Sequence, residues 1–267
     1  MKKPITLIEH EGVHKLNIPN ELYSHLLTHA YLYLQQAGWF NDYPCDEEGI
    51  TPWYTFPAIS FLKDIVSQNH RVFEYGSGYS TLYFKDKVNQ LITIEHSQDW
   101  ANKLLAENNN LDIHVVKENS GVHPEAQTVY DNFVDNTIQI RTEFYDHDLK
   151  HGLVNDEFGG YCSMIYQAPE KFYDIVVIDG MARHLCAVMT VESNRLKDDG
   201  ILILDNSDRW HYNPIQQYLH DKGYGRLDFW GPGWNNHSAW CTSFYSKKFV
   251  VNNNRLLRLE NDSPITV

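Results

Sequence analysis

The sequence predicts an α/β fold built on a mostly parallel sheet, and two observations support this. From residue 71 onwards, short β-branched and apolar runs alternate with stretches of helical periodicity, which is typical of repeated βαβ units. Two runs, 173–179 and 201–205, are nearly continuous apolar stretches that end in an aspartate, as expected for central strands buried on both faces. We therefore expect a three-layer sandwich with helices on both faces of the sheet.

The expected core covers residues 70–250. Its strands are predicted at 72–74, 91–95, 113–116, 173–179 and 201–205, followed by an antiparallel pair at 226–229 and 242–249 that closes one edge. A helix is expected over 97–107 with Ser97 as its N-cap, and another over about 183–196. Asp199 and Gly200 are expected to form the turn that enters the strand at 201–205.

Three further segments surround this core. Residues 1–69 are expected to form a helical N-terminal cap, with helices at 21–36 and 56–66 joined by an aromatic loop. A long polar and aromatic stretch at about 119–170 fits no simple crossover and is interpreted as an insertion that forms a lid. Residues 251–267 are expected to be a C-terminal tail.

Composition limits the classes of function. A length of 267 residues with 42% hydrophobic residues suits one core rather than two. The net charge of −13 argues against a nucleic-acid partner, because that binding depends on Lys and Arg that neutralise phosphates. The four cysteines form no CxxC pair, and no stretch approaches the length of a membrane span, so a cytoplasmic protein with reduced thiols is expected. The oligomeric state stays open.

The segment from Glu74 to Thr81, Glu-Tyr-Gly-Ser-Gly-Tyr-Ser-Thr, follows the first core strand and opens a helix. Glycines there permit a tight turn and a close approach of the backbone to a ligand. A dinucleotide turn would need a third glycine or alanine where Thr81 stands, and the carboxylate of Glu74 would repel a pyrophosphate but suits a cationic ligand. Glu95 ends the next strand about twenty residues later, where a carboxylate accepts hydrogen bonds from ribose hydroxyls.

These runs resemble the first two motifs of the class I S-adenosylmethionine-dependent methyltransferases, and the similarity covers roughly residues 70–250. The resemblance implies a Rossmann-like fold and S-adenosylmethionine as cofactor. It also implies a binding set in which the glycines line the methionine part, Glu74 faces the ammonium group through water and Glu95 holds the ribose, with His96 beside the adenine. The full predicted cofactor set is Glu74, Gly76, Ser77, Gly78, Ser80, Thr81, Glu95, His96 and Asp179.

Polar residues also end two later strands. Asp179, Asp205 and Asn206 should emerge at the carboxyl edge of the sheet, beside the glycine turn. Two carboxylates and an amide oxygen are suitable ligands for Mg²⁺ or another hard divalent cation. Their spacing resembles the metal-ligand pattern of the cation-dependent catechol and caffeoyl-CoA O-methyltransferases, although the lysine that follows the first aspartate in those enzymes is missing. The alternative is that Asp179 contacts acceptor or cofactor and Asp205 caps a helix or turn.

The expected activity is methyl transfer to a hydroxyl of a small molecule or saccharide. Asp179 and His184 are the candidate catalytic residues, and the candidate acceptor-binding residues are Trp53, Tyr54, Arg183 and Trp210. Three alternatives stay open: metal-independent transfer to nitrogen or oxygen, a non-catalytic S-adenosylmethionine-binding protein, and an NAD-dependent oxidoreductase.

Overall fold

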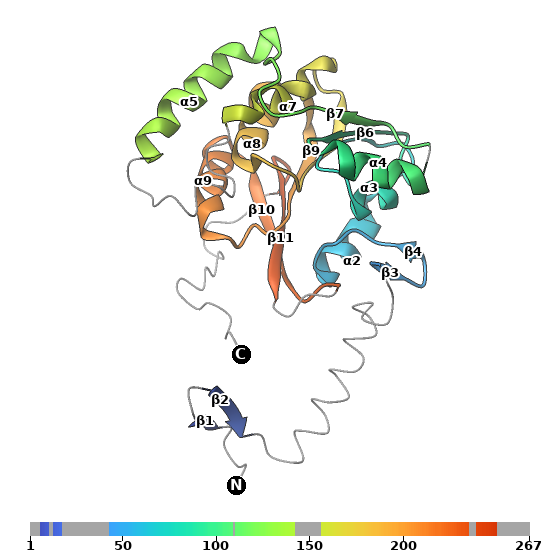
Figure 1. Cartoon of the computed structure of the whole chain (residues 1–267), viewed down its shortest axis with the longest axis vertical. Coiled ribbons are helices and arrows are strands. Elements are labelled where there is room, and N and C mark those ends of the chain that lie inside the picture. Colours follow the sequence, from blue (N-terminus) through green and yellow to red (C-terminus); the bar gives the residue numbers. More distant parts are fainter. Residues whose placement is uncertain are drawn as a thin grey trace.

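A computed structural model describes residues 6–10, 13–17, 43–108, 110–141, 156–234 and 239–249. Its centre is a seven-stranded sheet in the spatial order β10-β11-β9-β8-β5-β6-β7 (Figure 1). The strands are β5 (Arg71–Tyr75), β6 (Gln90–Glu95), β7 (Ile113–Val115), β8 (Tyr173–Ile178), β9 (Leu196–Leu204), β10 (Gly225–Gly231) and β11 (Trp240–Ser246). The strands from β5 to β9 pair in parallel, whereas β11 pairs antiparallel with both β9 and β10. The predicted α/β fold with an antiparallel C-terminal strand is confirmed.

Helices cover both faces of this sheet, because its central strands are apolar on both sides. One face carries α5 (Gln127–Arg141), α7 (Gly159–Ser163), α8 (Arg183–Glu192) and α9 (Asn213–Asp221), and its core includes Phe73, Tyr75, Ile94 and Val176. The opposite face carries α2 (Phe56–Ile65) and α3 (Tyr79–Phe84), which pack on Val72, Ile175, Val177 and Phe244. In Figure 1 these two groups of helices lie on opposite sides of the strands. Alternate side chains along β5 and β8 therefore point to opposite faces and pack in two separate cores.

Most predicted boundaries hold to within a few residues. Helix α4 (Gln98–Glu107) begins where expected, and the Ser97 hydroxyl accepts a hydrogen bond from the N–H of Trp100 at 3.3 Å. The expected turn at Asp199 and Gly200 is wrong, because both residues lie inside β9. The pairing of β8 with β9 shifts register after Tyr173, and this irregularity absorbs the residues between Leu196 and Ile201 without ending the strand.

The segments outside the sheet differ in how much can be described. Short strands β1 (Thr6–His10) and β2 (Val13–Asn17) form an antiparallel pair, where the sequence had suggested only a helical cap. The helix expected at 21–36 and the tail at 251–267 lie outside the described residues. Another short pair, β3 (Cys45–Asp46) and β4 (Gly49–Ile50), precedes α2. No helix in the described part of the chain is long and apolar enough to cross a membrane.

Part of the predicted insertion at 119–170 is also described. After β7 the chain forms the short helix η1 (Pro124–Ala126), then α5, and it returns through η2 (Asp156–Phe158), α7 and η3 (Met164–Gln167) to β8. Residues 142–155 are outside the described part. The helices α5 and α7 both contact α8, so this insertion packs on the same face of the sheet as the crossover helix.

Candidate active site at the carboxyl edge of the sheet

The strand ends predicted to carry the site are neighbours in space. Tyr75 is paired with Ile178, and Ile178 with Leu204, so the next residues along each strand are Gly76, Asp179 and Asp205. Backbone hydrogen bonds continue the ladder beyond the strands, from the N–H of Asp179 to the Tyr75 carbonyl at 3.0 Å and from that of Asp205 to the Ile178 carbonyl at 3.4 Å. The glycine turn and both aspartates therefore meet at one edge, as expected.

Gly76 brings the first and fourth core strands into direct contact. Its φ of +92° lies in the left-handed region, and a Cβ atom on it would lie 2.6 Å from the Cα of Gly180. A Cβ on Gly180 would in turn lie 2.9 Å from the Cα of Gly76. Gly78 is different, because it has an extended φ of 177° and an added Cβ would meet nothing within 4 Å. Gly76 is therefore required by the fold, whereas Gly78 leaves open space beside the turn.

Glu74 supports this turn from beneath. Its side chain is fully buried and accepts hydrogen bonds from the hydroxyls of Ser80, Thr81 at 2.6 Å and Thr93 at 2.9 Å. Burial raises the pKa of Glu74 to about 7, against the opposing effect of these hydroxyls. Ser80 and Thr81 are buried as well. In this structure all three predicted cofactor residues face one another, so they position the turn rather than presenting oxygens to a ligand.

Glu95 converges on the turn from the adjacent strand. One carboxylate oxygen accepts hydrogen bonds from the N–H of His96 at 2.9 Å and of Ser97 at 2.8 Å, and the other from the N–H of Ser77 at 3.0 Å. The Ser77 hydroxyl also donates to this second oxygen at 2.8 Å, and the Nδ1 of His96 lies 2.9 Å from the first oxygen. Burial alone would raise the pKa of this acid, but these contacts together lower it to about 2.

The geometry at Glu95 fits a ribose. Three backbone N–H groups fix the orientation of the carboxylate, while its remaining two contacts come from side chains, Ser77 and His96, that can rotate. A ribose diol would replace those two side chains and leave the backbone contacts in place. The residues of the turn therefore fit the predicted cofactor at the point where an acid is needed.

The position proposed for a divalent cation is taken by Arg183. Its Nη2 contacts a carboxylate oxygen of Asp179 at 2.9 Å and the carbonyl of that residue at 3.2 Å. Its Nη1 donates to the Asp205 carbonyl at 2.5 Å and reaches the Asn206 amide oxygen at 3.5 Å, and its Nε donates to the Gly180 carbonyl at 3.1 Å. No cluster of three or more His, Cys, Asp or Glu side chains suited to a metal occurs among the described residues. The guanidinium therefore contacts all three residues predicted as metal ligands, Asp179 through its carboxylate, Asn206 through its amide oxygen and Asp205 through its backbone carbonyl.

Asp205 is held from the antiparallel strand. One of its oxygens accepts hydrogen bonds from the indole N–H of Trp240 at 3.1 Å and the hydroxyl of Thr242 at 2.5 Å. Burial and the nearby charge of Asp179 raise its pKa to about 7, although Arg183 and the two donors oppose this. Trp240 and Thr242 were not predicted for the site. They lie more than thirty residues beyond Asp205 in sequence, and no local motif marks them.

No protein-family model and no curated protein sequence matches the chain. Several solved structures align with most of the chain at low sequence identity. A methyltransferase-like protein from Silicibacter pomeroyi is 18% identical over 73% of this chain and 88% of its own, with a TM-score of 0.42. Precorrin-6y C5,15-methyltransferase from Geobacter metallireducens is 10% identical over 78% and 95%, with a TM-score of 0.46. An rRNA methylase from Streptococcus thermophilus is 8% identical over 72% and 96%, with a TM-score of 0.42.

The sheet order of the chain itself, with its single antiparallel strand next to β9, decides the fold. It is the Rossmann-like α/β fold that the sequence predicts. The glycine turn follows the strand at which the order reverses, where β5 lies between β8 and β6. Open α/β sheets bind their ligands in the crevice at such a switch point.

The residues predicted to bind the acceptor occupy different environments. Trp53 is 41% exposed and packs edge-on against Trp234, with ring centroids 4.9 Å apart, while Tyr79 lies 6.3 Å from the same indole. We call Trp53, Tyr79 and Trp234 the aromatic rim. Trp210 is also exposed, but Tyr54 is fully buried. Arg183 is buried and its nitrogens are engaged by Asp179 and by backbone carbonyls, so it is not free to bind an acidic acceptor.

His184 is not suited to the role of general base. Its side chain is buried between α8 and α5, where it meets the ring of Phe133 edge-on at 5.1 Å. Burial lowers its pKa to about 4, so the imidazole is a weak proton acceptor near neutral pH. Arg183 and His184 are adjacent in sequence, and the sequence alone does not show that their side chains contact different parts of the protein.

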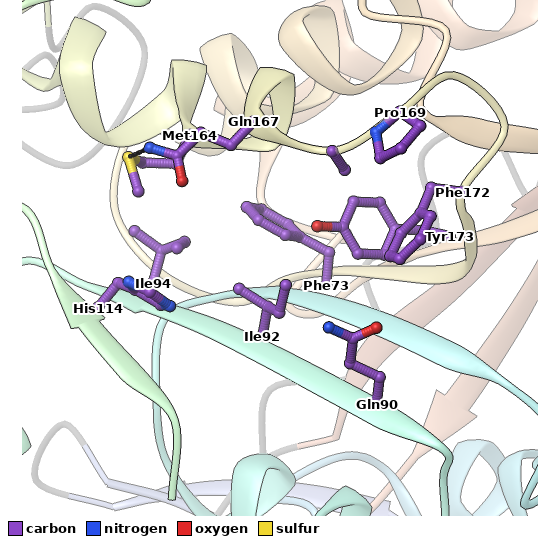
Figure 2. Close-up of a pocket in the computed structure, with 11 residues that line it drawn as sticks. Phe73, Gln90, Ile92, Ile94, His114, Met164, Gln167, Pro169, Phe172 and Tyr173 are labelled. Atoms are coloured by element: carbon purple, nitrogen blue, oxygen red, sulfur yellow. Dashed lines mark hydrogen bonds between the residues drawn. The ribbon is translucent and has the colours of Figure 1, made fainter.

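A separate apolar cavity of about 260 Å³ lies on the face of the sheet that carries α7 and α8. Figure 2 shows Phe73, Ile92 and Ile94 beneath it, with Met164 and Gln167 of η3 above and Phe172 at one end. None of the predicted site residues lines it. The cavity therefore belongs to the packing of the insertion on the sheet and not to the carboxyl edge.

Proposed function

We propose that this protein is an S-adenosylmethionine-dependent methyltransferase that acts on a hydroxyl group of a small molecule or saccharide. The observation that carries the proposal is the convergence of two elements. The carboxylate of Glu95 lies 3.0 Å from the backbone nitrogen of Ser77, inside a glycine turn that follows the central strand. An acid for a ribose and an open turn for the rest of the cofactor thus share one site.

A carboxylate beside the glycine turn supports a cationic cofactor. Asp179 is the carboxylate beside the turn with part of its side chain exposed, at 24%. An ammonium or sulfonium group placed there would face negative charge, whereas a pyrophosphate would be repelled. Thr81, which stands where a dinucleotide turn needs a small residue, is buried and bonded to Glu74, and this disfavours an NAD-dependent oxidoreductase.

When bound, S-adenosylmethionine supplies an activated methyl group. The chain's own contribution is to fix the cofactor through Glu95 and the turn, and to hold an acceptor beside it. Positioning and exclusion of water account for catalysis in this proposal, and no general base is assigned. Trp53 is the exposed member of the aromatic rim, and its flat ring suits stacking on a sugar or an aromatic acceptor, which supports the choice of acceptor class. Because Arg183 occupies the cation position, transfer without a metal is the form of the reaction that we propose.

Calorimetric titration tests the cofactor assignment. S-adenosylhomocysteine, the demethylated product, is expected to bind the folded protein, and NAD⁺ is expected to give no heat of binding. Transfer of a labelled methyl group from S-adenosylmethionine to catechol or to a methyl glycoside then separates an enzyme from a cofactor-binding protein without activity. Absence of S-adenosylhomocysteine binding by correctly folded protein would refute the proposal.

A further inference from the structure

Tyr161 carries a buried hydroxyl that makes no hydrogen bond within the described part of the chain. Its side chain is fully buried, yet its hydroxyl has no hydrogen-bond partner among the residues that the structure describes. The neighbouring Tyr75 shows the usual solution, because its hydroxyl donates to the Cys162 carbonyl at 2.7 Å. A buried hydroxyl without a partner costs free energy, and such groups in native proteins call for an explanation.

The hydroxyl of Tyr161 lies at the glycine contact. A Cβ atom built on Gly180 would be 2.2 Å from it and 2.9 Å from the Cα of Gly76, so the phenol reaches the point where β5 and β8 meet. The ring of Tyr161 lies 6.5 Å from that of His96 and 5.7 Å from that of Tyr75. Tyr161 thus approaches the candidate cofactor site from the face that carries α7 and α8.

The position of Tyr161 is set by close packing of its helix. The two residues before it are glycines, and both touch the chain that follows β7. A Cβ on Gly159 would lie 2.6 Å from the ring of Tyr130, and one on Gly160 would lie 2.6 Å from the Ser120 carbonyl oxygen. Side chains larger than hydrogen would push α7 outward and withdraw the phenol. The sequence Gly-Gly-Tyr therefore places this hydroxyl where it is.

We propose that the hydroxyl of Tyr161 is a hydrogen-bonding ligand of the bound cofactor. The proposal rests on the assignment of S-adenosylmethionine to this site. Burial keeps the phenol protonated, with a pKa raised well above its usual value, so it can both donate to and accept from a ligand. Tyr161 is here a binding residue from the insertion, which joins the cofactor residues of the turn and of β6.

Tyr166 provides a matched control. It lies five residues further on in η3, it is also buried, and its hydroxyl likewise has no hydrogen-bond partner in the described part of the chain. Its ring, however, stacks on His123 with centroids 5.9 Å apart and lies beneath the guanidinium of Arg195, which are different neighbours from those of Tyr161. Removal of either hydroxyl deletes an unpartnered buried group, so neither Tyr161→Phe nor Tyr166→Phe is expected to unfold the protein.

The experiment measures the dissociation constant of S-adenosylhomocysteine by calorimetry for the wild type, Tyr161→Phe and Tyr166→Phe. Tyr161→Phe is expected to bind about ten-fold more weakly, as for the loss of one hydrogen bond in a desolvated site, with its unliganded melting temperature unchanged or raised. The thermal shift produced by a fixed ligand concentration should fall in the same variant. Tyr166→Phe should match the wild type in both measurements.

Equal dissociation constants for the two variants would overturn the proposal, whether both match the wild type or both are weakened by the same factor. In the first case the phenol only packs, and in the second the loss comes from the insertion as a whole. No binding by the wild type itself overturns the cofactor assignment, and the assignment of Tyr161 with it.

Discussion

The two halves of the candidate site stabilise their buried carboxylates with different kinds of partners. In the cofactor half, formed by residues 74–81 and Glu95, the partners are hydroxyls and backbone N–H groups within about twenty residues. In the carboxylate half, formed by residues 179–183 and 205–206, the partners are a guanidinium and two donors from β11. The first half is organised by local hydrogen bonds, and the second by a charge and by long-range pairing.

The largest loss of stability is expected when the backbone contact between the two halves is disturbed. Gly76→Ala would place a Cβ against Gly180 at a φ of +92°, so both halves must shift. We expect a loss of about 3 kcal/mol or more in the free energy of unfolding, measured by urea denaturation. Gly78→Ala is the control, because its Cβ meets no neighbour, and its stability should remain within about 0.5 kcal/mol of the wild type. Similar losses in both variants would show that the Gly76 contact is not what joins the halves.

The second prediction removes the charge on which the carboxylate half depends. Arg183→Met leaves Asp179 and Asp205 near each other without the guanidinium and strips donors from three backbone carbonyls. Breaking a buried pair on one side costs about 3 kcal/mol at pH 7, and denaturation should show this loss. Arg226→Met is the comparison, because Arg226 and its partner Asp228 are partly exposed, and its cost should stay below about 1 kcal/mol. An Arg183 variant as stable as the wild type would contradict this account of the site.

The third prediction concerns the two glutamates of the cofactor half. The pKa of Glu74 is raised in the folded protein to about 7, above its value in the unfolded chain, so this group makes folding less favourable as pH rises from about 4.5 to 7. The pKa of Glu95 is lowered to about 2, so its contribution is present above pH 4.5 and is lost as pH falls towards 2. Glu74→Gln should therefore gain stability relative to the wild type as pH rises, by about 2 kcal/mol at pH 8.

Glu95→Gln should show the reverse, with a loss of about 2 kcal/mol at pH 7 that shrinks on acidification. Denaturation curves between pH 4 and 8 measure both variants against the wild type. Parallel pH profiles for the two would mean either that burial does not dominate at Glu74 or that the contacts of Glu95 with His96, Ser97 and Ser77 do not outweigh burial there.

The contrast between the halves also explains what the sequence could show. The strands, the glycine turn and Glu95 follow from short-range patterns, since apolar runs, glycine spacing and the distance from Glu74 to Glu95 are all local. The role of Glu74 was harder to predict, because nothing local shows that three hydroxyls enclose its carboxylate.

The carboxylate half was interpreted as a cation site for a physical reason. A set of Asp, Asp and Asn oxygens suits any positive charge, and sequence alone does not tell a bound ion from a guanidinium. The sequence makes Arg183 a candidate contact for an acceptor, and its position four residues after Asp179 also allows the ion pair that the structure shows. The donors from β11 depend on the register of β9 with β11, which no local pattern encodes.

The smallest expected effect is the response to divalent cations. Arg183 already bonds the Asp179 carboxylate, the Asp205 carbonyl and the Asn206 amide oxygen, so the oxygens that a divalent cation would need are engaged. Addition of EDTA or of Mg²⁺ should leave both the S-adenosylhomocysteine affinity and the melting temperature of the wild type unchanged. In Arg183→Met the guanidinium is gone while the same oxygens remain, and Mg²⁺ should raise the melting temperature of that variant alone. A Mg²⁺-dependent rise in the wild type would show instead that the two aspartates bind a metal beside the arginine, and the proposed metal-independent reaction would have to be given up.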